Sequence, residues 1–119
     1  GREFVKQFPD ISDRLCSALT PYEFWLFSLL IPYVGVNSGI LKFRNGIFVQ
    51  RRSLLEVVDN RISRAMVDKC MNGLVSKGIL AKCQIRDKKC YIMNPYVCHK
   101  GSKANETLLT LFKDSGWEG

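Results

Sequence analysis

The amino-acid sequence predicts a mainly α-helical domain with a small antiparallel β element. Three observations support this fold class. The chain has 119 residues, of which 46% are apolar, so it is long enough and apolar enough for one domain with a core. Several segments combine helix-start signals with apolar residues at helical spacing. After residue 78 the apolar residues alternate with polar ones, which is typical of short paired strands.

The first two expected helices supply core. Asp10 or Ser12 can cap a short first helix. Thr20 then provides an N-cap, Pro21 the first helical position and Glu23 the partner in a capping box. The helix that starts there should continue to about residue 31. It is apolar nearly all round, and such a helix belongs at the centre of a small core.

An extended segment separates these helices from the next pair. Residues 40–49 are typical of two short strands, with Asn45-Gly46 as a two-residue hairpin turn between them. Residues 51–58 should then form a short helix, which Ser53 can cap. The polar residues 59–61 interrupt the helical pattern, so we expect a tight turn there.

A longer helix follows this turn. Ser63 is a good N-cap for it, and the helix should run to Lys77, where Gly78 closes it. Its apolar residues recur at spacings of three and four, and they are Val67, Cys70, Met71, Leu74 and Val75. One face of this helix should therefore pack on the core while the opposite face meets solvent.

A β-hairpin with a basic tip should come next. The first strand alternates from Ile79 to Ile85, the second runs from Cys90 to Met93, and residues 86–89 join them. Asn94-Pro95 ends the hairpin. Lys100 to Lys103 then form a basic polar link to the last helix.

Positive charge is concentrated in the middle of the chain. The 18 Lys and Arg against 11 Asp and Glu give a formal charge of +7. Residues 1–50 carry a net +1, residues 51–103 a net +8, and residues 104–119 a net −2. A local basic excess of this kind indicates a polyanion-binding surface, whereas charge kept only for solubility would be scattered.

The order of elements in this basic segment predicts a winged helix-turn-helix. A short helix, a tight turn, a longer helix and a β-hairpin follow one another, and in that arrangement the longer helix enters the major groove of DNA. The hairpin, or wing, lies along the backbone or a neighbouring minor groove. Single-domain binding of double-stranded DNA is therefore the function we expect.

Residue chemistry assigns roles within that arrangement. Arg64 can reach the two acceptors of guanine, Ala65 can touch a thymine methyl group, and Lys69 or Asn72 can contact bases or phosphates. Asp68, on the same face, pairs with a neighbour such as Arg64, accepts from a cytosine amino group, or opposes close approach. The expected phosphate contacts come from Arg51, Arg52, Ser53, Arg61 and the helix start at Ser63, with Arg86, Lys88 and Lys89 in the wing.

Four segments also carry a family resemblance. They are Leu19-Thr20-Pro21-Tyr22-Glu23, Ile62-Ser63-Arg64, the stretch from Gly73 to Leu80, and Tyr91-Ile92-Met93-Asn94-Pro95-Tyr96-Val97-Cys98-His99-Lys100-Gly101. Together they resemble the RepL-type plasmid replication proteins over about residues 19–113. The resemblance implies a winged-helix initiator that recognises an origin in plasmid or phage replication, with host replication proteins as partners for polymerisation.

Three other functions remain open on the sequence. A transcriptional regulator of the multidrug-resistance-repressor type would share the fold, and the position of its binding site would distinguish it. A thiol or metal sensor could use Cys70 or the adjacent Cys98 and His99. A winged helix that binds only protein would show no salt dependence, because that dependence comes from phosphate contacts.

Enzyme activity is not expected. His99 is the only histidine, and no glycine-rich phosphate loop, catalytic triad or cluster of metal-binding carboxylates can be assembled. The cysteines are odd in number and form no C-x-x-C pair, so we expect reduced, mostly buried thiols, with no metal and no cofactor.

The C-terminal segment, about residues 104–115, is expected to contain the last helix, from Asn105 to Lys113. Two roles remain open for it: Leu108, Leu111 and Phe112 could close the core of their own chain, or they could form a homodimer contact. Exposed parts of the second helix offer another such contact. We expect no membrane span and no signal peptide, and hence a cytoplasmic protein.

Overall fold

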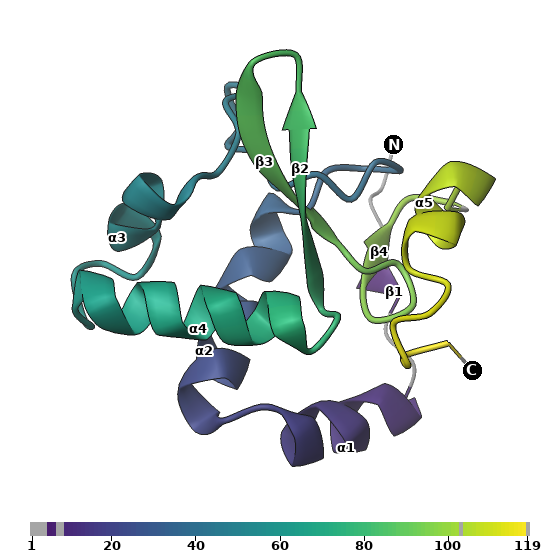
Figure 1. Ribbon diagram of the computed structural model, residues 1–119, viewed down its shortest axis with the longest axis horizontal. Helices are drawn as coiled ribbons and strands as arrows, with labels where there is room; N and C mark the ends of the chain where they lie inside the picture. The colour runs from purple at the N-terminus through teal and green to yellow at the C-terminus, as the bar shows by residue number, and fades with distance from the viewer. Residues whose placement is uncertain (1–4, 7–8, 103, 119) are drawn as a thin grey trace.

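Five α-helices and two small antiparallel sheets make up the part of the chain that the computed structural model describes, residues 5–6, 9–102 and 104–118 (Figure 1). The helices are α1 (Pro9–Ala18), α2 (Pro21–Leu30), α3 (Leu54–Val57), α4 (Arg64–Ser76) and α5 (Glu106–Leu111), with 3₁₀ helices η1 (Ile31–Tyr33) and η2 (Arg51–Ser53). The strands are β1 (Val5–Lys6), β2 (Leu80–Ile85), β3 (Lys88–Met93) and β4 (His99–Lys100). The predicted mainly α-helical fold with a small antiparallel β element is confirmed.

The start of α1 differs from the prediction, whereas the start of α2 agrees with it. Because α1 begins at Pro9, Asp10 and Ser12 lie inside the helix and neither is its N-cap. At α2 the Thr20 hydroxyl accepts from the backbone N–H of Glu23, and the Glu23 carboxylate accepts from the backbone N–H of Thr20 at 2.8 Å. This reciprocal pair is the predicted capping box.

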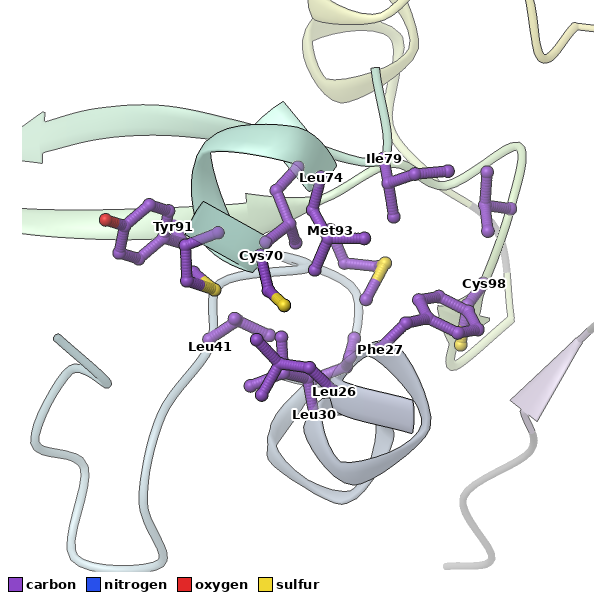
Figure 2. Packing of buried hydrophobic residues seen from close by; sticks show 14 of the residues in the cluster. Leu26, Phe27, Leu30, Leu41, Cys70, Leu74, Ile79, Tyr91, Met93 and Cys98 are labelled. Carbon is purple, nitrogen blue, oxygen red and sulfur yellow. The ribbon is translucent and has the colours of Figure 1, made fainter. Parts of the chain in front are cut away.

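Helix α2 packs against α4 at the centre of the core. Figure 2 shows Leu26 and Leu30 of α2 below Cys70 and Leu74 of α4, with Met93 of β3 beside them. All five side chains are almost completely buried. The predicted inner face of the longer helix is thereby confirmed, and its opposite face is left at the surface.

The segment 40–49 folds back on itself, but its turn is not the predicted one. Lys42 and Phe48 form a single bridge, and the N–H groups of Phe43 and Gly46 donate to the carbonyls of Ile47 and Phe43. Three residues, 44–46, therefore form the loop, and Gly46 has a φ of 85°. A three-residue loop that ends in a left-handed residue needs glycine only at its last position.

The second hairpin, β2–β3, is regular. Its register pairs Leu80 with Met93 and Ile85 with Lys88, so only Arg86 and Asp87 form the turn. Lys88 and Lys89 were predicted to lie in the tip, but both belong to β3. In Figure 1 this hairpin rises away from α4, while α3 lies near the amino end of α4.

Asn94 fastens the end of β3 to the rest of the chain. Its side-chain amide donates to the carbonyl of Gly78 at 2.8 Å and to the hydroxyl of Ser115 at 3.0 Å, and its oxygen accepts from the backbone N–H of Tyr96 at 2.9 Å. The side chain is fully buried. A buried amide with its groups satisfied in this way holds three chain segments together.

The predicted basic link after the hairpin is partly wrong. Lys100 lies in β4, which pairs with β1, and its side chain is buried with Nζ donating to the carbonyl of Pro32 at 2.9 Å. Lys103 lies outside the described residues. Among the helices that the structure describes, none is both long enough and apolar enough to cross a membrane.

Candidate nucleic-acid interface

The outward face of α4 carries several of the expected contact residues. The hydroxyl of Ser63 accepts from the backbone N–H of Met66 at 3.2 Å, which confirms Ser63 as the N-cap. The side chains that follow on the outward face are exposed, and they are those of Arg64, Ala65, Lys69 and Asn72. This face is therefore available to a partner along more than two turns of helix.

Arg51 is held against this face by three side chains. Its Nε donates to the hydroxyl of Tyr91 on β3 at 2.8 Å, its Nη1 lies 3.5 Å from Oδ1 of Asp68, and its Nη2 donates to Oδ1 of Asn72. The Tyr91 hydroxyl, aided by Asp68, raises the pKa of Arg51 despite partial burial. Only 27% of the Arg51 side chain is exposed, so much of this cation is already engaged.

The same contacts settle the partner of Asp68. Of the alternatives that the sequence left open, ion pairing is present, but with Arg51 of η2 instead of Arg64 of the same helix. A contact with Arg51 spans 17 residues and depends on how η2 packs on α4. Helical spacing alone, which suggested Arg64, could not reveal it.

Ser53 does not cap the short helix. Its hydroxyl accepts from the backbone N–H of Gln50 at 2.9 Å and donates to the carbonyl of Gln50 at 2.7 Å. The hydroxyl therefore closes the 3₁₀ turn η2 and makes no capping bond to α3. The neighbouring Arg52 and, within the polar turn 59–61, Arg61 are both exposed.

A basic groove is lined by η2 and the β2–β3 hairpin. Its volume is about 810 Å³. The lining residues are Gln50, Arg51, Arg52, Lys82, Cys83, Gln84, Asp87, Lys89, Cys90 and Tyr91. Cationic side chains therefore outnumber the one carboxylate of the lining, and a groove with that balance concentrates a positive field.

Lys82 is the cation of the groove that the sequence did not single out. It is exposed on β2, directly across the hairpin from Tyr91. Its position among the polar residues of the alternating strand could have indicated an exposed side chain on this hairpin. The predicted residues Arg86 and Lys88 are exposed at the end of the hairpin and do not line the groove.

The cysteines are mostly inside the protein. Cys70, Cys90 and Cys98 are buried, Cys83 is partly buried and Cys16 is exposed, and all five are free thiols. Cys83 and Cys90 face each other across the hairpin. Burial and the neighbouring Cys83 thiol raise the pKa of Cys90 to about 11. Within the described ranges, no three His, Cys, Asp or Glu side chains gather as metal ligands.

Most of the apolar side chains expected at a homodimer contact are already used within the chain. Leu108 and Phe112 are buried in a small cluster with Ile92, whereas Leu111 is 53% exposed. Helix α5 also ends at Leu111, two residues before the predicted end. The observed packing corresponds to the expectation that this helix covers its own chain.

Comparisons with known proteins found no relative of this chain. No protein-family model matches the chain, and searches of curated proteins and of solved structures found no match.

Proposed function

We propose that this chain binds double-stranded DNA sequence-specifically as a winged helix-turn-helix. The observation that carries the proposal is the basic groove, lined by Arg51, Arg52, Lys82 and Lys89, beside the exposed face of α4. An exposed helix face fits the major groove, and the exposed groove cations beside it, Arg52, Lys82 and Lys89, fit the phosphates that flank it. The β2–β3 hairpin serves as the wing.

The proposed biological role is origin recognition in plasmid or phage replication, as in the RepL-type proteins that the sequence resembles. The domain supplies the binding step, and host replication proteins supply the enzymes. A transcriptional regulator would use the same surface. Binding to repeats within the origin of the gene's own replicon supports replication, whereas binding over a neighbouring promoter overturns that role in favour of regulation.

A salt series on a labelled duplex tests the DNA-binding proposal. Duplexes selected from a random library by the wild-type protein serve as the specific probe, and scrambled duplexes as the non-specific one. Each lost phosphate contact should lower the slope of log affinity against log salt by about 0.9. Lys82→Ala should show that change on both probes. The matched control is Lys113→Ala, an exposed lysine beyond α5 that should leave the slope unchanged.

Arg64→Ala tests the helix as the reading element. Its loss should cost roughly 1–3 kcal/mol on the selected duplex and little on the scrambled one, because a base contact is specific. Salt-independent binding, or equal effects of the Lys82 and Lys113 substitutions, would contradict the groove as the phosphate site. Equal effects of Arg64→Ala on both duplexes would contradict α4 as the reading helix.

A further inference from the structure

The contact between Arg51 and Asn72 fixes the orientation of an exposed amide. A guanidinium carries only donors, so the atom of Asn72 that faces Nη2 of Arg51 must be the carbonyl oxygen. The amide nitrogen of Asn72 is then the group left for a partner. In the described structure no protein acceptor is recorded for that nitrogen, and the Asn72 side chain lies on the exposed face of α4.

Arg51 holds this orientation without help from DNA. The hydroxyl of the buried Tyr91 accepts from its Nε at 2.8 Å, and Asp68 lies 3.5 Å from its Nη1. Two anchors from β3 and α4 thus fix the plane of the guanidinium from different sides. A donor that is oriented before binding loses less side-chain freedom when it meets its acceptor.

We propose that Arg51 is a positioning residue that makes Asn72 select guanine over adenine in the major groove. This inference rests on the proposed function. An unrestrained asparagine prefers adenine, because its oxygen accepts from N6 while its nitrogen donates to N7. Here one lone pair of that oxygen already accepts from Nη2 of Arg51, so an adenine amino group is left with the second lone pair and must bring its hydrogens close to those of the guanidinium. Guanine presents only acceptors, N7 and O6, on the corresponding edge.

The charges around Asn72 do not reverse its preference for guanine over adenine. Asp68 is the acidic group beside Arg51, and its pairing with Nη1 offsets part of the positive charge. The selection therefore comes from donor geometry at Asn72. Attraction of the positive charge to base acceptors would favour guanine and thymine alike, because both present an acceptor in the major groove. Guanine alone has two adjacent acceptors that match the two hydrogens of the Asn72 amide nitrogen.

The test measures base preference instead of affinity alone. Equilibrium binding is measured on the selected duplex and on duplexes with each base pair replaced in turn by the other three. Asn72→Ala identifies the base pair that this residue reads, since only there should discrimination disappear. We expect guanine at that position in the wild type, favoured about five- to tenfold over adenine.

Substitution of Arg51 then separates positioning from simple attraction. Arg51→Met keeps the aliphatic length and removes every donor, so guanine preference should fall and adenine should gain at the Asn72 position. Arg52→Met is the matched control, because Arg52 is the adjacent exposed groove arginine and should lower affinity for all duplexes alike. Tyr91→Phe removes only the hydroxyl that anchors Nε, and it should weaken the guanine preference if Arg51→Met fails to fold.

The outcomes distinguish the inference from the proposed function. If the wild-type protein binds no duplex, the proposed function fails and the inference fails with it. If it binds but prefers adenine at the Asn72 position, or if Asn72→Ala alters no base preference, only the inference is overturned. An unchanged guanine preference in folded Arg51→Met or Tyr91→Phe likewise overturns the positioning role alone.

Discussion

Replacing Gly73 of α4 with alanine should destabilise the protein, although alanine is the better helix former. A Cβ at this position would overlap Oε2 of Glu23 and would lie 2.9 Å from its Cδ. The carboxylate cannot simply swing away. Its Oε1 accepts from the backbone N–H of Thr20 at 2.8 Å and from Nζ of Lys77 at 2.5 Å, and Glu23 is buried. Alanine must therefore displace a group that joins α2 to α4.

The opposing effects give a definite sign. Glycine to alanine inside a helix normally gains about 1 kcal/mol. Losing the Glu23 half of the capping box costs about 1 kcal/mol. The bond to Lys77, whose side chain is 33% exposed, adds about 1–2 kcal/mol. Gly73→Ala should thus lower the free energy of unfolding by about 1–2 kcal/mol.

A double-mutant cycle with Glu23→Ala isolates the contact. In that background the obstacle is gone, so Gly73→Ala should stabilise by about 1 kcal/mol. Urea denaturation followed by far-UV circular dichroism gives all four free energies. Ser76→Ala, at the exposed end of the same helix, should change stability by no more than about 0.5 kcal/mol. If Gly73→Ala stabilises both backgrounds equally, the carboxylate is not fixed against Gly73.

Three further predictions concern pH, thiol reactivity and the buried amide. Burial tends to raise the pKa of Glu23, but its hydrogen bonds outweigh burial and hold the pKa below the ordinary 4.5. The contribution of Glu23 to the free energy of unfolding is therefore present above pH 4.5 and should be lost as the pH drops through the folded pKa. In urea denaturation at several pH values, the free energy of unfolding of Glu23→Gln should fall less than that of the wild type. At pH 8 a thiol with a pKa of about 11 is ionised in roughly one molecule in a thousand, so mass spectrometry during iodoacetamide treatment should find the exposed Cys16 labelled well before Cys90. Asn94→Ala should cost about 2–4 kcal/mol in urea denaturation against about 1 kcal/mol for Asn105→Ala at the α5 cap, and equal costs would contradict the linking role of Asn94.

Local sequence signals predicted the elements that depend on neighbouring residues. The Thr20 capping box, the Ser63 cap and the glycine after α4 were all correct, because each bond lies within a few residues of its partner. Gly78 takes a φ of 78°, the left-handed geometry that such a helix end favours. The burial of Lys100 could not be predicted in this way, since it depends on a carbonyl 68 residues away.

Two adjacent arginines lie in different surroundings that the sequence alone could not predict. Arg51 and Arg52 have the same chemistry and the same expected role, yet Arg51 is tied to α4 and β3 while Arg52 faces solvent. The 3₁₀ turn that carries them rotates successive side chains by about 120°, so only one of them can point at the helix. Which one does so depends on the packing of η2 and on the place of Tyr91 in the hairpin register. Charge along the sequence therefore predicted a basic surface, whereas the fold was needed to show which arginine is tied to α4 and β3 and which faces solvent.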